Sequence, residues 1–242
     1  MITYFFRTVK DEKLQTNTEP RAGVWAHVVE PTDADIDTLV AQFLLDKSIL
    51  LDARDFFEVP RFERAGSVAY FFTRYPYEDE EGREIDTAPI LIAVGESFVI
   101  TVILREAPFL ADFISGAKEI HTTQKTKLFL ELMQGLHEAY NRELLKMNRD
   151  VNKSKSKLRS VRTRTIEQLV RYENALNDIV SALVPTNVWL AQVLGGNHLQ
   201  LFKEDVALGE DLTITNNQLV DSAKMLLKTI QNIRSAYESI LT

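Results

Sequence analysis

The first part of the chain alternates short apolar runs with polar breaks, in the pattern of strands joined by loops and short helices. The runs are rich in aromatic and β-branched residues, which favour strands. They span residues 2–7, 24–29, 67–75, 89–94 and 97–104. These segments therefore predict a sheet.

Polar residues between these runs predict how the strands are connected. Thr32 can cap a helix, with Asp33 and Asp35 in its positive first turn. The Gly-Glu-Ser sequence at residues 95–97 lies between two apolar runs and predicts a tight hairpin, so part of the sheet is expected to be antiparallel. The acidic stretch at residues 78–86 is interpreted as a solvated loop.

The hydrophobic period changes near Lys118. Residues 136–194 contain no glycine and a single proline, Pro185, and their apolar positions recur at steps of three and four. This pattern predicts two long helices, or one that folds back. A further heptad follows at Leu212, Asn216, Leu219, Ala223, Leu226, Ile230, Ile233, Tyr237 and Ile240.

Two interpretations of this last heptad remain open on the pattern alone. One is the core of a three-helix bundle within the chain, and the other is a stalk between chains. As a helix, residues 212–241 would form a rod of roughly 45 Å. In the stalk interpretation, Asn216 faces a neighbouring chain and sets the register, as a buried polar residue at a heptad core position can.

Composition narrows the possible functions. The chain has 242 residues, an apolar fraction of 45% and no cysteine, so a packed core is expected and thiolate chemistry is excluded. The net charge of −7 argues against a general nucleic-acid binder, because duplex affinity comes largely from Lys and Arg. The N-terminus does not resemble a signal peptide, and no apolar run reaches the roughly 18 residues of a membrane span.

The usual catalytic arrangements are missing. His137 and Glu138 begin like a zinc-protease helix, but Asn141 occupies the position of the second histidine. The sequence has no phosphate-binding glycine loop and no nucleophile elbow. We therefore expect no enzyme activity, and the alternative is an α/β enzyme that uses an unrecognised carboxylate pair.

Three segments together resemble the CorA family of magnesium and divalent-cation transporters. They are the Trp-Ala-His-Val-Val-Glu-Pro-Thr run at residues 25–32, the Leu-Asp-Ala-Arg-Asp-Phe-Phe-Glu-Val-Pro-Arg-Phe-Glu run at residues 51–63, and the paired strands at residues 89–104. The resemblance implies an α+β protein: an α/β/α sandwich with a mixed sheet at residues 1–117, then a long-helix region at residues 118–242 that ends in a coiled-coil stalk helix.

The resemblance also implies a function. The chain would be the cytoplasmic, cation-sensing part of a homopentameric channel, with its last helix leading into an absent pore helix. The family's Gly-Met-Asn triplet is not present, so we expect the chain to stop before the first membrane helix. Magnesium is the expected ion, with cobalt, nickel or zinc as other possibilities. A zinc-transporting relative and a coiled-coil scaffold without a pore are the alternatives.

In the family, regulatory cations bind between the α/β domain of one subunit and the stalk of its neighbour. Asp52 falls on the family's acidic position in the α/β domain. The stalk position falls on Ile214, so Asp211, one turn earlier, is the expected substitute. Magnesium retains several waters and often uses only one or two carboxylates, which allows a shifted ligand.

A basic segment at residues 146–164 forms a second candidate surface. It contains eight Lys or Arg and one acidic residue, Asp150. If the three long helices run up, down and up, this segment lies at the same end as Thr242. The membrane would then face it, and anionic headgroups would attract it.

Overall fold

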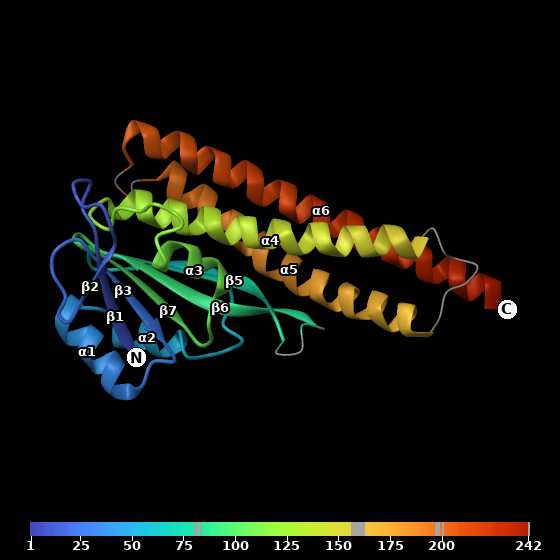
Figure 1. Ribbon diagram of the computed structural model, residues 1–242, viewed down its shortest axis with the longest axis horizontal. Coiled ribbons are helices and arrows are strands. Elements are labelled where there is room, and N and C mark those ends of the chain that lie inside the picture. The colour runs from blue at the N-terminus through green and yellow to red at the C-terminus, as the bar shows by residue number, and fades with distance from the viewer. Residues whose placement is uncertain (80–81, 83, 156–162, 197–198, 200, 242) are drawn as a thin grey trace.

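The computed structural model describes residues 1–242 apart from 80–81, 83, 156–162, 197–198, 200 and 242. It shows a sheet with two short helices on one face and three long helices on the other (Figure 1). The long helices extend well beyond the sheet, so one end of the molecule is entirely helical. The predicted α+β fold class is confirmed.

The sheet has seven strands in the order β2-β1-β3-β7-β6-β5-β4. β3 and β7 pair in parallel, whereas the other neighbouring strands pair antiparallel, so the sheet is mixed as predicted. The strands are β1 (Ile2–Phe6), β2 (Gln15–Asn17), β3 (Val24–Val29), β4 (Arg61–Ala65), β5 (Val68–Glu78), β6 (Ile85–Val94) and β7 (Phe98–Ile103).

Both faces of the sheet are buried, which explains why its strands contain continuous apolar runs. Successive side chains point to opposite faces. Trp25 and Phe71 therefore belong to the core under the long helices, whereas Ala26 and Tyr70 belong to the core under the short ones.

The short helices α1 (Asp33–Phe43) and α2 (Lys47–Asp52) cover the second of these faces. Thr32 caps α1 as predicted: its hydroxyl accepts from the backbone N–H of Asp35, and the Asp35 carboxylate accepts from the backbone N–H of Thr32. This capping box satisfies donors that the first helical turn leaves free.

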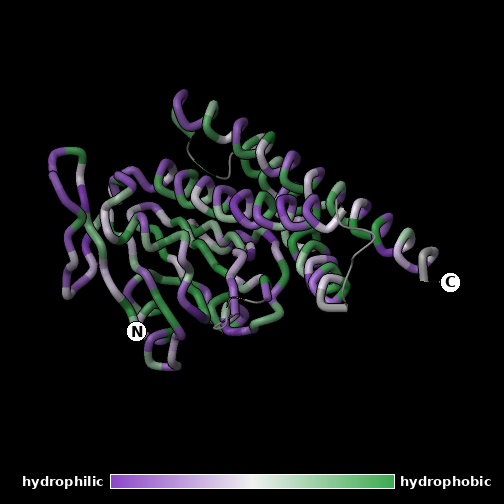
Figure 2. Tube along the Cα trace, turned by 45° about the vertical axis from the view of Figure 1, so that its right-hand side comes forward, coloured by the Kyte–Doolittle hydropathy of each residue, from purple (hydrophilic) through white to green (hydrophobic). Residues whose placement is uncertain are grey.

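The opposite face carries α3 (Pro108–Ile114) and the long helices α4 (Lys125–Lys155), α5 (Thr163–Gly195) and α6 (Lys203–Leu241). α4 and α5 contact the sheet directly. The ring of Phe71 lies 4.3 Å from that of Phe129 in α4 and 5.3 Å from that of Trp189 in α5, between ring centroids. α6 packs on the outside of this pair, and apolar positions recur along all three helices (Figure 2).

The long helices run up, down and up. The C-terminal end of α4 and the N-terminal end of α5 therefore lie at the same end of the molecule as the C-terminus of α6 (Figure 1). With 39 residues, α6 is about 58 Å long and begins at Lys203, earlier than the heptad suggests.

The packing of α6 decides between the two interpretations of its heptad. Its core positions from Leu212 to Ile233 are buried within the chain, so the seam packs against α4 and α5. The stalk interpretation of Asn216 is wrong: its side chain is fully buried and its amide donates to the carbonyl of Leu183 in α5, 2.9 Å away.

Two strands were missed by the hydrophobic pattern. β2 and β4 are short edge strands, and β4 carries charged residues, Arg61, Glu63 and Arg64, among few apolar ones. The sequence predicts a loop for the acidic stretch at residues 78–86, but the two ends of this stretch belong to β5 and β6.

Candidate functional site

Asp52 is the last residue of α2, and its side chain is half exposed. Its carboxylate accepts a hydrogen bond of 2.8 Å from the Arg61 guanidinium. Glu58 and Glu63 pair with the same guanidinium, which also lies over the ring of Phe72. Three carboxylates therefore surround one cation, which leaves a local excess of negative charge.

Asp211 is exposed on α6 and lines a groove of about 380 Å³ between α6 and α4. His137 and Glu138 line the groove from α4, and the Glu138 carboxylate pairs with Lys118. Thr215 and Gln218 add further polar groups from α6. The groove thus combines carboxylate, imidazole and neutral polar side chains.

His137 is the most unusual residue of this groove. Burial lowers the pKa of its imidazole to about 4, while the side chain of Asn216 beside it acts in the opposite direction. Neither ring nitrogen has a hydrogen-bond partner of normal geometry among the described residues. The imidazole is therefore neutral at physiological pH.

One chain does not bring Asp52 and Asp211 together. Asp52 lies on the face of the sheet that α1 and α2 cover, whereas α6 lies beyond α4 and α5 on the opposite face (Figure 1). In the described part of the chain, no group of three or more His, Cys, Asp or Glu residues is placed to hold a metal ion.

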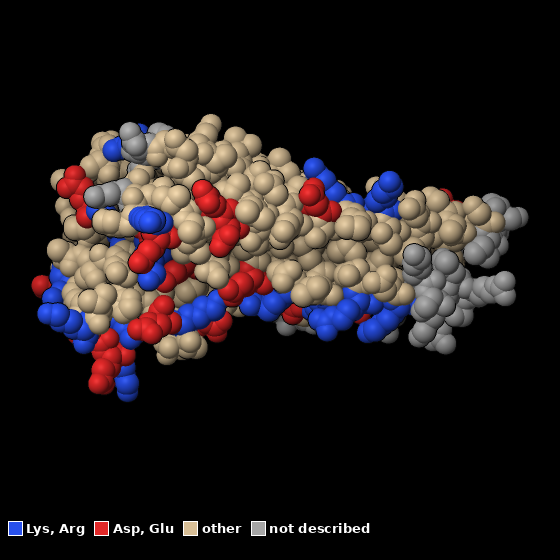
Figure 3. All heavy atoms as spheres, turned by 90° about the horizontal axis from the view of Figure 1, so that it is seen from above, with Lys and Arg blue, Asp and Glu red and all other residues tan. Residues whose placement is uncertain are grey.

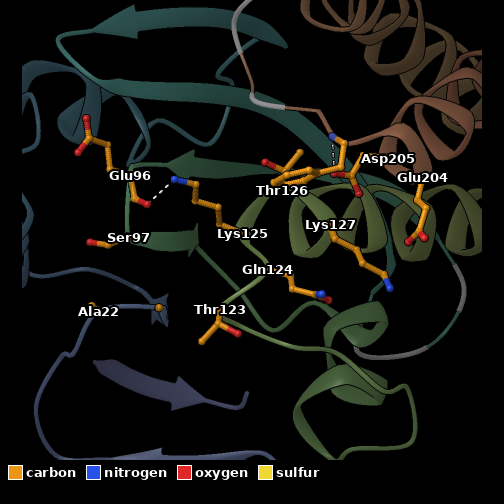
Figure 4. Close-up of a pocket in the computed structure, with 12 residues that line it drawn as sticks. Ala22, Glu96, Ser97, Thr123, Gln124, Lys125, Thr126, Lys127, Glu204 and Asp205 are labelled. Atoms are coloured by element: carbon orange, nitrogen blue, oxygen red, sulfur yellow. Dashed lines mark hydrogen bonds between the residues drawn. The ribbon is translucent and has the colours of Figure 1, made fainter. Parts of the chain in front are cut away.

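A cavity of about 610 Å³ lies elsewhere (Figure 4). The first turns of α4 and α6 line it together with the β6–β7 hairpin, and the Lys125 ammonium donates to the backbone carbonyl of Glu96. Asp205 accepts from the backbone N–H of Phe202 at 3.0 Å and so caps α6. Three acidic residues, Glu96, Glu204 and Asp205, and two basic ones, Lys125 and Lys127, line this cavity, so its charges nearly balance.

Glu131, in α4, has a strongly perturbed carboxyl group. Burial raises its pKa to about 7, Lys127 lowers it, and the negative charges of Asp205 and Glu119 raise it further. Ionisation of this carboxyl group is therefore less favourable in the folded chain than in water.

The basic segment at residues 146–164 lies only partly in the described structure. Lys146 pairs with Glu78 at the end of β5, and Lys153 lies 3.5 Å from the Asp150 carboxylate. Residues 156–162 lie outside the described residues. Lys and Arg side chains follow one edge of the helical region toward its far end (Figure 3).

Apolar side chains also remain exposed on the outer surface of the bundle. Val184 and Val188 lie on α5, and Ile214 and Met225 lie on α6. Ile214, the expected family position, is 55% exposed. In the described part of the chain, no helix is both long and apolar enough to cross a bilayer.

Sequence reasoning missed several residues of these sites. Glu58, Arg61 and Glu63 stand in the same motif as Asp52, and their charges were the available signal. The sequence around His137 and Glu138 resembles only the start of a protease motif. Their proximity to Asp211 depends on how α4 packs against α6, which no local pattern reports.

The fold resembles those of solved CorA and ZntB structures. The complete CorA magnesium transporter of Methanocaldococcus jannaschii matches with a TM-score of 0.86 at 16% identity, over 99% of this chain and 77% of that one. The soluble domain of CorA from the same organism matches with a TM-score of 0.86 at 19% identity, over 99% of this chain and 97% of that one. The ZntB cytoplasmic domain of Vibrio parahaemolyticus RIMD 2210633 matches with a TM-score of 0.80 at 10% identity, over 98% of this chain and 96% of that one.

No curated protein sequence matches the chain. The family model described as CorA-like Mg2+ transporter protein, however, matches residues 21–242, which include the Asp52 motif, the strands from β3 to β7 and all three long helices. This chain belongs to the CorA-like Mg2+ transporter family.

Proposed function

We propose that the chain is the cytoplasmic, cation-sensing part of a homo-oligomeric divalent-cation transporter, on the cytoplasmic side of the cell membrane, and has no enzyme activity. In this arrangement α6 leads toward the membrane. Residues 1–117 supply one side of each contact between subunits, and residues 118–242 supply the other.

The observation that carries this proposal is the outward placement of acidic groups on opposite sides of the chain. The Asp52 cluster lies beside α2, and the Asp211 groove lies on the outside of α6. When copies are arranged around an axis, the same two surfaces meet at every boundary. Acidic surfaces that face each other repel, and a divalent cation between them relieves the repulsion.

Self-association has separate support from the exposed apolar side chains on the bundle. Val184, Val188, Ile214 and Met225 cost free energy while they contact water, and a neighbouring copy would cover them. The homopentameric state is the one that the family resemblance implies.

Magnesium is the first candidate for the cation, because it binds through one or two carboxylates and retained waters. The imidazole of His137 favours a second candidate. Histidine nitrogen suits zinc, cobalt and nickel better than magnesium, and His137 lines the same groove as Asp211.

The test is thermal unfolding and sedimentation of the chain with and without millimolar magnesium or micromolar zinc, at matched ionic strength. A cation that binds only the assembled form stabilises it by about 2.7 kcal/mol at a hundredfold excess over Kd. Asp52→Ala should remove most of this gain, and Asp211→Ala a smaller part. Asp221→Ala, on an exposed position of α6 outside the groove, is the control. Identical responses of wild type and Asp52→Ala would reject the site.

A further inference from the structure

Four basic side chains form a stripe along one face of α4. Arg142, Lys146, Arg149 and Lys153 follow each other at steps of four, three and four residues, which places them on the same side of a helix. Arg142, Arg149 and Lys153 are exposed, and Lys146 is partly exposed. We call this set the basic stripe. It contrasts with the whole chain, whose net charge is −7.

The stripe leads to the end of the molecule where the chain terminates. α4 runs toward the far end of the bundle, and α6 finishes at that same end (Figure 1). Blue side chains along this edge in Figure 3 approach the same end. Lys153 is therefore nearer the end of the bundle than Arg142, by eleven residues or about 16 Å of helix.

The residues of the basic stripe differ in their ion pairs within the chain. Lys146 is engaged by Glu78, and Lys153, at the end of the stripe, lies 3.5 Å from the Asp150 carboxylate with its side chain exposed. Arg149 donates only to the backbone carbonyl of Leu145, 3.3 Å away, and has no carboxylate within ion-pair distance among the described residues. A cation of this kind retains its full attraction for an external anion.

We propose that Arg149 and Lys153, at the end of the basic stripe, bind the anionic headgroups of a lipid bilayer with the long helices upright. This inference rests on the proposed function, which places the membrane at the end of α6. The remaining surface is acidic overall, so a bilayer attracts one end of the molecule and repels the rest. Such an arrangement orients the chain, whereas a dispersed polyanion would contact the stripe along its whole length.

The upright orientation makes a graded prediction. Screening limits electrostatic attraction to about 8–10 Å at physiological ionic strength. Arg142 lies about 16 Å farther from the end than Lys153, so it contributes little to binding. The two residues share one helix face, which makes Arg142 an internal control for position.

The experiment is co-sedimentation of the 242-residue chain with vesicles of phosphatidylcholine alone or with about one third phosphatidylglycerol, at low and moderate salt. We expect binding only to the anionic vesicles. Arg149→Gln with Lys153→Gln should weaken it on the order of thirtyfold, about fivefold for each residue near the surface. Arg142→Gln, and Lys10→Gln with Lys13→Gln in the sheet region, should change it less than twofold.

Equal losses in all these variants would show non-specific charge attraction and overturn the inference. Absent binding, or equal binding to both vesicle types, would overturn it as well. Cation-dependent assembly is measured without vesicles. A chain that assembles with cation but ignores anionic vesicles rejects this inference alone, and the opposite result rejects the proposed cation site alone.

Discussion

Replacing Glu131 with Gln tests how the start of α4 is held in the folded chain. The carboxyl group is partly buried near Asp205 and Glu119, and burial, with help from their charges, raises its pKa to about 7. In the unfolded chain the ordinary value is 4.5. Between these two values the folded state holds the proton and the unfolded state releases it, so the stability from this group is lost as pH rises through 7.

The magnitude follows from the difference between the two pKa values. A full shift of this size corresponds to about 3.4 kcal/mol. The side chain is partly exposed and water screens its interactions, so we expect about 1–2 kcal/mol. Glu131→Gln keeps the shape and removes the titration. The variant should therefore be more stable than wild type by this amount at pH 8 and equally stable at pH 4.5.

The assay is urea unfolding followed by circular dichroism at a series of pH values. His27 and His137, whose pKa values burial lowers to about 4, act in the opposite direction between pH 4 and 6.5. Both proteins contain them, so their effect cancels in the difference between variant and wild type. Glu210→Gln, on the exposed face of α6, is the matched control. A difference for Glu131→Gln that stays constant from pH 4.5 to 8 would refute the reasoning.

Two further changes test the packing of the long helices. Gly135→Ala should destabilise the fold by about 1–2 kcal/mol in chemical denaturation, because its methyl group would lie 2.6 Å from a carbon of the buried Phe113 ring and this overpacking exceeds the gain in helix propensity. A more stable variant would contradict this close contact. Asn216→Leu should cost about 1 kcal/mol through the lost hydrogen bond to Leu183 without altering the mass in light scattering, because the contact lies within one chain. A changed oligomeric state would show that Asn216 faces a neighbour.

Local patterns were sufficient for the elements that are long or buried on both faces. The five apolar runs became β1, β3, β5, β6 and β7 because both faces of the sheet are covered, and burial on both faces requires continuous apolar residues. The scarcity of glycine and proline after Lys118 allowed the long helices. The cap at Thr32 depends on atoms three residues apart, so the sequence alone determined it.

Tertiary packing decided where each functional side chain faces. A heptad specifies which positions are apolar but not which chain covers them, and only the folded bundle showed that Asn216 faces α5. The edge strand β4 forms because its backbone pairs with β5, and this pairing places Arg61 beside Asp52. Asp211 and His137 are far apart in sequence, and they share a groove because α6 packs against α4. Such contacts depend on the relative positions of whole elements, which the burial of many side chains determines together.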